Sequence, residues 1–306
     1  MSALRGRIAD LSPAELSARL HGDGLALSVP PFTVRVRSPI PVVREGIERM
    51  YALHEHMGDD EVFCDFHLSI LPRLGWTGLR CELDVDGQRP FTPLARGEAF
   101  AFFEWGLNWC VTSHCHHWLT LHAAVLERDG RAVLLPAPPG SGKSTLCAWL
   151  MQQGWRLMSD ELALIDPATG QLSASPRPVS LKNESIVLMR ERLPGAVFGP
   201  VAHDTLKGMV AHLRVNESSL RQAALPATPR WIVFPRFEKG VALRAVPRPK
   251  PQTLVELASN SFNHHVHGPR GFDCLADLVD GCEAFDLSYS QLDDATAWFD
   301  SLARPS

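Results

Sequence analysis

The segment from Ala137 to Thr145 restricts the fold of this chain more than any other, and it reads Ala-Pro-Pro-Gly-Ser-Gly-Lys-Ser-Thr. An apolar run typical of a β-strand precedes it, and helix-forming residues follow it as far as Gly154. A glycine-rich turn between a strand and a helix, ended by lysine and a hydroxyl residue, is typical of loops that bind phosphate through backbone N–H groups. The segment therefore predicts an α/β domain with a nucleotide site at this turn.

The residue types in this loop predict how a nucleotide would be held. Its glycines let the backbone approach the phosphates, Lys143 can reach the β- and γ-phosphate oxygens, and the hydroxyl of Ser144 suits Mg2+. ATP and Mg2+ are therefore the expected cofactors. The complete motif begins with glycine where this chain has Ala137, the smallest replacement. The residues expected to contact the nucleotide are Pro139, Gly140, Ser141, Gly142, Lys143, Ser144 and Thr145.

Two adjacent carboxylates follow the loop. Asp160 and Glu161 begin 160 − 143 = 17 residues beyond Lys143, within a segment from Trp155 to Ile165 that is expected to be a strand. Because a strand presents neighbouring residues to opposite faces, one carboxylate is expected to face the metal and the other the phosphoryl acceptor. A strand-end pair exposed to water is the alternative interpretation.

Basic residues elsewhere are candidates for contact with the transferred phosphate. His122 lies on the first strand of the expected hairpin, next to the strand that ends in the loop, although a hydrogen-bonded core histidine is the alternative. Lys182, Lys207 and Arg236 could neutralise charge on the phosphoryl group, and each is equally explained as a solvated surface charge.

Charge and cysteine usage exclude several classes of protein. The chain has 34 acidic and 30 basic residues, a formal net charge of -4, and no basic stripe, so nucleic acid is not an expected partner. Seven scattered cysteines form no disulfide framework and are expected to be reduced. No segment resembles a signal peptide or a membrane span, which predicts a cytoplasmic protein without membrane contact.

Hydrophobic patterning divides the chain into two expected domains, a small α+β domain over residues 1–95 and an α/β catalytic domain over residues 96–306. Apolar strands before the loop, joined at Asp129-Gly130, indicate a β-hairpin. The other expected strands are residues 32–37, 66–71, 79–84, a pair within 171–181, and 231–234. The expected helices are residues 42–56, 98–118, 183–192 with Asn183 as the cap, and 293–303.

Residues 119–165 resemble the HPr kinase/phosphorylase family and the wider phosphoenolpyruvate-carboxykinase-like group. The matching residues are His122-Ala123, the hairpin, Pro139 to Thr145, and Gly154 to Glu161. The resemblance implies a P-loop kinase domain of that type, with His122 beside the nucleotide. It further implies that Asp160 acts as the base toward an acceptor serine and that Glu161 helps to bind the metal, as Asp160 also could.

The whole chain looks like the HPr-kinase-related group called kinase A, through Glu104 to Trp109, Lys207-Gly208 and Phe234 to Phe237. That resemblance implies a peptide or small-protein substrate and a PqqD-like partner, and the similarity to kinases of lasso-peptide pathways, which phosphorylate a serine, implies a serine as the acceptor. The glycine-rich signature that follows the acid pair in HPr kinases is absent, so HPr is not the expected acceptor. The sequence leaves the oligomeric state open.

Two other functions fit the same loop. Small-metabolite kinases of the shikimate or gluconate type also carry an acid soon after it, although their chains usually begin with the loop, and here 136 residues precede Ala137. A nucleotide-responsive binding module with little turnover is the second alternative.

Overall fold

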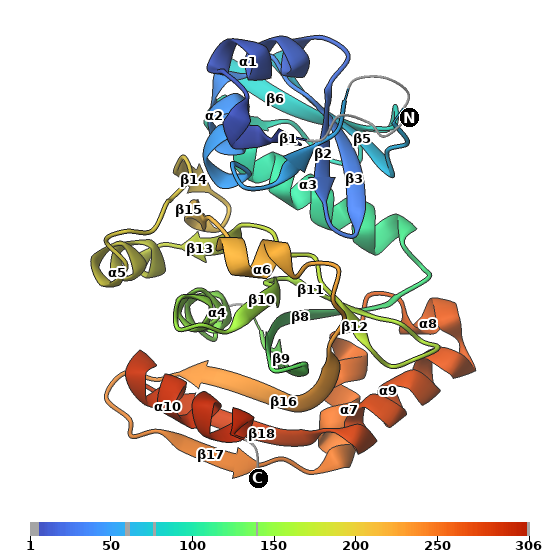
Figure 1. Cartoon of the computed structure of the whole chain (residues 1–306), viewed down its shortest axis with the longest axis vertical. Coiled ribbons are helices and arrows are strands. Elements are labelled where there is room, and N and C mark those ends of the chain that lie inside the picture. Colours follow the sequence, from blue (N-terminus) through green and yellow to red (C-terminus); the bar gives the residue numbers. More distant parts are fainter. Residues whose placement is uncertain (1–5, 59–61, 76–77, 139, 305–306) are drawn as a thin grey trace. The chain divides into compact units, whose positions relative to one another are not determined.

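The computed structural model describes residues 6–58, 62–75, 78–138 and 140–304, and it is a mixed α/β protein (Figure 1). Its contacts form two compact units. Residues 1–111 and 177–220 make the first unit, and residues 112–176 and 221–306 make the second. The predicted division after residue 95 has one boundary, whereas these contacts change unit at three points. Where independently folding domains begin and end therefore stays a prediction.

The first unit contains a seven-stranded sheet. Its strands, in spatial order, are β1 (Gly6–Arg7), β4 (Glu55–His56), β2 (Leu25–Val29), β3 (Phe32–Arg37), β5 (Phe66–Gly75), β6 (Gly78–Val85) and β7 (Leu94–Ala95). The helices of this part are η1 (Ile8–Asp10), α1 (Pro13–His21), α2 (Pro41–Met50), η2 (Arg96–Glu98) and α3 (Ala99–His114). The alternation that predicts a strand over residues 32–37 is confirmed, because buried and less buried residues alternate along β3.

A three-stranded sheet completes the first unit. It orders β13 (Val179–Lys182), β15 (Gly208–Leu213) and β14 (Ala202–Thr205), and it is accompanied by α5 (Glu184–Arg192) and α6 (Glu217–Arg221). Asn183 is the N-cap residue of α5, as predicted, but its side chain makes no cap hydrogen bond. Instead Asn183 donates to the carbonyl of Lys207 at 3.2 Å and accepts from the amide of Met209 at 3.0 Å. The side chain of Asn183 therefore binds a turn at Lys207 to Met209, far from it in the sequence.

The second unit contains the sheet whose strand β9 leads into the loop of Ala137 to Thr145. Its strands are β12 (Leu172–Ser173), β11 (Leu162–Ile165), β8 (Leu119–Arg128), β9 (Arg131–Pro136), β16 (Thr228–Phe237), β18 (Glu283–Tyr289) and β17 (Arg244–Pro247), with β10 (Arg156–Ser159) also paired to β8. The predicted hairpin is confirmed, and Asp129 and Gly130 have φ values of 54° and 77° in its turn. The strand pair predicted within residues 171–181 is wrong, because β12 pairs with β11 and β13 pairs with β15.

Five helices of the described residues belong to the second unit: α4 (Lys143–Gln152), α7 (Lys250–Ser259), α8 (His264–His267), α9 (Pro269–Gly281) and α10 (Leu292–Ala303). One core cluster unites β8, β9 and β16 with α7 and α9 through residues such as Leu121, Leu134, Ile232 and Leu275. Hydrogen bonds then attach α10, because Trp149 donates to Thr296 at 2.9 Å and Trp155 to Asp300 at 3.0 Å.

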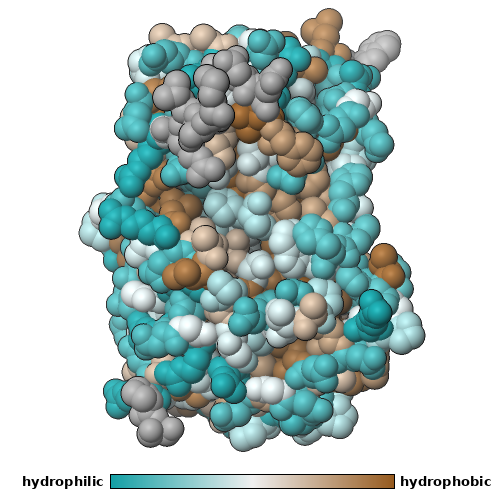
Figure 2. Space-filling model, turned by 45° about the vertical axis from the view of Figure 1, so that its right-hand side comes forward, coloured by the Kyte–Doolittle hydropathy of each residue, from teal (hydrophilic) through white to brown (hydrophobic). Residues whose placement is uncertain are grey.

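Hydrophilic residues predominate on the face drawn in Figure 2, and hydrophobic residues show between them in several places. None of the helices in the described ranges has the length and hydropathy that crossing a membrane requires.

Candidate functional site

The register of β8 brings the loop and the acid pair to the same strand position. On one side of β8, Ala123 pairs with Pro136, the last residue of β9 before the loop. On the other side, His122 pairs with Leu162, the first residue of β11. The loop and the residues before Leu162 therefore flank His122 from opposite sides.

The acid pair lies in a bend between two strands, so the prediction that it lies inside one strand is wrong. Asp160 and Glu161 separate β10 from β11, and the register of β10 with β8 shifts just before them, between Leu157 and Ser159. A bulge of this kind redirects side chains. Asp160 is buried at 5% exposure, whereas the side chain of Glu161 is 25% exposed.

The loop has the backbone form that its glycines predict. Gly140 and Gly142 have φ values of 87° and 90°, in the left-handed region that favours glycine. The amide of Phe237, at the end of β16, donates to the carbonyl of Ser141 at 2.9 Å. A Cβ on Gly142 would lie 2.9 Å from the Cβ of Phe237 and 3.0 Å from the hydroxyl of Tyr289, so this glycine also meets a steric requirement. Pro139 lies outside the described residues.

Helix α4 begins at the end of this loop with features that suit an anion. Gly142 is its N-cap and provides no side chain, and its first turn contains no acidic residue. The first N–H groups of a helix lack intrahelical partners and carry partial positive charge. Ser144 and Thr145 lie in this first turn and are half-buried. This helix end can therefore accept phosphate oxygens without displacing a carboxylate of its own first turn.

Lys143, His122 and Glu161 form one cluster. The Nζ atom of Lys143 lies 3.3 Å from Nε2 of His122 and 4.0 Å from Oε2 of Glu161. The same Nε2 atom lies 3.0 Å from Oε2 of Glu161. Because one ring nitrogen faces both a cation and a carboxylate, the tautomer with a proton on Nε2 fits best, donating to Glu161 while the ammonium interacts with that carboxylate through charge.

Asp160 lies in a different environment from its neighbour. It is close to the buried thiol of Cys147, which stands one helical turn after Lys143 on α4. Burial raises the pKa of the Cys147 thiol well above its usual value, and the negative charge of Asp160 raises it further. The thiol is therefore neutral. Asp160 is buried next to it, in the interior of the domain, and not at the solvent surface.

Among the other candidate basic residues, Arg236 forms its ion pair outside this cluster. Arg236 has a side chain 76% exposed, and its Nε atom lies 2.9 Å from Oε1 of Glu238. Lys182 and Lys207 belong to the first unit. The Nζ atom of Lys207 lies 5.5 Å from the ring centroid of Trp105, in a cation–π contact.

Phe262 stands beside the cluster, although the sequence contained no signal for it. Its ring centroid lies 6.1 Å from that of His122, and the ring is partly exposed. The amide of Phe262 donates to the carbonyl of Thr120 at 3.0 Å, while that of His122 donates to Asn260 at 2.8 Å. Residues 260–262 thus lie beside the start of β8, a long-range pairing that local patterns do not encode.

The residue types fit a magnesium ion that arrives with a nucleotide. Ser144, Asp160 and Glu161 offer a hydroxyl and two carboxylates, the hard oxygen ligands that Mg2+ prefers alongside phosphate oxygens. Within the described ranges, no group of three or more histidine, cysteine, aspartate or glutamate residues could hold a metal ion by itself.

Comparisons with known proteins give limited similarity. A family model described as "SynChlorMet cassette protein ScmC" matches residues 106–188, which include β8, the loop, α4 and the acid pair. No curated protein matches the chain. A solved structure, the Hpr(Ser) kinase/phosphatase from Coxiella burnetii, is 13% identical over 60% of this chain and 96% of that chain, with a TM-score of 0.26. A TM-score this low does not establish a shared fold.

Proposed function

We propose that this chain is an ATP- and Mg2+-dependent kinase that transfers the γ-phosphoryl group to a hydroxyl, most favourably a serine of a peptide or small protein. The observation that carries the proposal is the position of the Lys143 ammonium, 3.3 Å from His122 and 4.0 Å from Glu161, at the start of a helix that opens with a glycine-rich turn. Phosphates bound at this turn would lie within reach of a cation and a carboxylate together.

The proposal assigns the base role to Glu161 rather than to Asp160. A base must come within hydrogen-bond distance of the acceptor hydroxyl, which approaches from solvent. The Glu161 side chain is partly exposed and is oriented by His122 at 3.0 Å, whereas Asp160 is almost fully buried beside Cys147. Asp160 and Ser144 are then the residues that would hold Mg2+, which supplies charge neutralisation on the phosphates when bound.

In the transfer step, the acceptor oxygen forms a bond to the γ-phosphorus while the bond from that phosphorus to the ADP oxygen breaks. The hydroxyl proton passes to the Glu161 carboxylate, which the Nε2–H group of His122 keeps in position. Lys143 neutralises charge on the β- and γ-phosphate oxygens. The N–H groups at the start of α4 do the same for the phosphate nearest the loop.

The acceptor class rests on the resemblance to peptide-directed kinases and on the surroundings of His122. Phe262 offers a partly exposed aromatic ring next to that histidine. Such a ring suits an apolar side chain beside a serine better than it suits a highly hydroxylated small metabolite.

The test incubates the full chain with Mg2+, γ-labelled ATP and a library of serine-containing peptides, with shikimate and gluconate in parallel. Label in serine peptides is the expected result. Label in a metabolite alone would replace the acceptor class, and saturable ATP binding without transfer to any acceptor would favour a nucleotide-responsive module.

Variants of the two carboxylates test the assigned roles. Glu161→Gln should retain affinity for Mg2+ with ATP but reduce kcat by about 100-fold or more, as expected for loss of a general base. Asp160→Asn should instead weaken Mg2+-dependent ATP binding. If Asp160→Asn loses transfer with unchanged ATP affinity while Glu161→Gln stays active, Asp160 is the base.

A further inference from the structure

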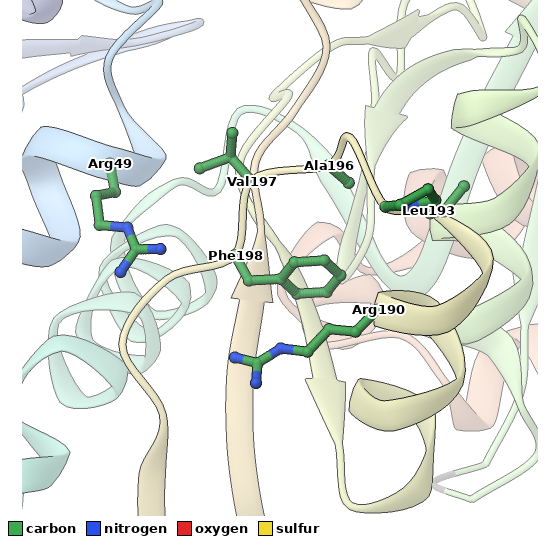
Figure 3. A pocket seen from close by; sticks show the side chains of 7 residues that line it. Arg49, Arg190, Leu193, Ala196, Val197 and Phe198 are labelled. Carbon is green, nitrogen blue, oxygen red and sulfur yellow. The ribbon is translucent and has the colours of Figure 1, made fainter.

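A pocket in the first unit lies between the end of α2, the last turns of α5 and the segment that follows α5. Its volume is about 410 Å³. Arg49 and Arg190 line it together with the apolar side chains Leu193, Val197 and Phe198 (Figure 3). The volume is within the range of ligand-binding pockets, roughly 300–1,000 Å³.

The apolar floor of this pocket, formed by Leu193, Val197 and Phe198, is held in place by backbone hydrogen bonds. The amide of Arg214, beyond β15, donates to the carbonyl of Val197 at 2.9 Å, and the amide of Gly199 donates to His212 at 2.8 Å. Ala196 donates back to Leu193 at 3.0 Å, which closes the turn after α5. Because hydrogen bonds fix both ends of the segment, little ordering is needed when a ligand binds.

The two guanidinium groups supply the charge of the pocket. Arg190 lies against the Phe198 ring, 5.3 Å from its centroid, and Figure 3 shows its guanidinium extending toward the side where Arg49 lies. Among the described residues, no carboxylate makes an ion pair with Arg190. Arg49 is 3.1 Å from Oε1 of Glu45, a pair exposed to solvent and therefore weak.

We propose that this pocket binds an acidic peptide segment, whose carboxylates pair with Arg49 and Arg190 while an apolar side chain between them covers Leu193 and Val197. An inorganic anion would leave the partly exposed side chains of Leu193 and Val197 in water, and a purely apolar ligand would give Arg190 no carboxylate partner. Planar guanidinium groups match carboxylates in bidentate geometry, which suits this ligand class. The proposal is independent of nucleotide chemistry at the loop.

The test measures fluorescence anisotropy of a labelled seven-residue peptide of alternating glutamate and leucine, titrated with the full chain. Two matched peptides replace all glutamates by glutamine or all leucines by serine. The acidic, leucine-containing peptide should bind, and each matched peptide should bind at least about tenfold more weakly, a change of about 1.4 kcal/mol. Equal binding of all three peptides, or of none, would overturn the proposal.

Variants connect the binding to this pocket. Arg190→Gln and Val197→Glu should each weaken binding about tenfold or more, the first by removing a charged donor and the second by placing a negative charge on the floor. Arg44→Gln is the control, since Arg44 is also on α2 but pairs with Glu48 at 2.5 Å and does not line the pocket. Unchanged binding in both test variants would refute the site. Saturation by adipate without peptide binding would show that the pocket takes a small diacid instead.

Discussion

Among single residues, Glu104 has an unexpected pKa. It is fully buried in α3, where Oε1 accepts from the hydroxyl of Tyr51 at 2.7 Å and Oε2 lies 3.5 Å from Nη1 of Arg177. Burial raises the pKa of Glu104 to about 7, and the charge of Arg177 only partly opposes that shift. Tyr51 and Arg177 therefore surround a carboxyl group that titrates near neutral pH.

This shift predicts how stability depends on pH. A carboxyl group with a raised pKa binds its proton more tightly in the folded state, so its contribution is complete below the unfolded pKa of 4.5 and decreases as pH rises toward about 7. Relative to Glu104→Gln, the free energy of unfolding of the wild type should fall over this window, by at most about 1.4 kcal/mol per pH unit. Urea unfolding from pH 4.5 to 8 measures the difference, and a difference that does not vary with pH would contradict it.

Among helices, strands and loops, those that depend on local sequence patterns could be predicted. The hairpin, the loop and α4 follow from strand alternation, an Asp129-Gly130 turn and a glycine-rich segment, all of which depend on neighbouring residues. The bend at Asp160 and Glu161, the side chain of Asn183 and the position of Phe262 depend on partners more than 20 residues away. Sequence patterns within one element do not contain that information.

The loop predicts a difference between its two glycines. Gly140→Ala and Gly142→Ala both place an alanine at positive φ, which costs about 1 kcal/mol. Only the Gly142 change also meets Phe237 and Tyr289, whereas a Cβ on Gly140 has open space. Nucleotide affinity should therefore fall more in Gly142→Ala, as measured by calorimetric titration with an ATP analogue. Equal losses would mean that packing against β16 and β18 does not set the loop conformation.

Helix α10 gives a second prediction for an element. Oδ1 of Asp300 accepts hydrogen bonds from the buried indole of Trp155 and from Arg128. Asp300→Ala leaves the indole N–H without its acceptor and should destabilise the protein by about 1–3 kcal/mol. Asp300→Asn keeps an acceptor oxygen and should lose less. Chemical denaturation of both variants tests this order; about equal losses would show that charge pairing with Arg128 is the larger contribution.

For the whole molecule, the first compact unit extends beyond residue 95 to residue 111 and also includes residues 177–220. Helix α3 fills the first unit, since the Phe100 ring contacts Gly46 on α2 and Phe103 packs against Tyr51. Composition and patterning did not predict that residues 177–220 join this unit. That result needs long-range contacts such as the one between Arg177 and Glu104.

A fragment of residues 1–95 should therefore fail to fold cooperatively, because it lacks the aromatic residues of α3. Circular dichroism during thermal unfolding should show a broad transition, in contrast to the full chain. A sharp transition with native-like secondary structure would support the boundary predicted from sequence.

In the proposed nucleotide site, the loop binds a polyphosphate through Lys143. Calorimetric titration of the full chain with a non-hydrolysable ATP analogue and Mg2+ tests it most directly. We expect saturable binding that weakens at least about tenfold in Lys143→Ala. Binding should be unchanged in Lys250→Ala, a surface lysine that pairs with Asp280. Absence of binding to the wild type, or equal affinity in the Lys143→Ala variant, would show that Lys143 does not hold a nucleotide phosphate.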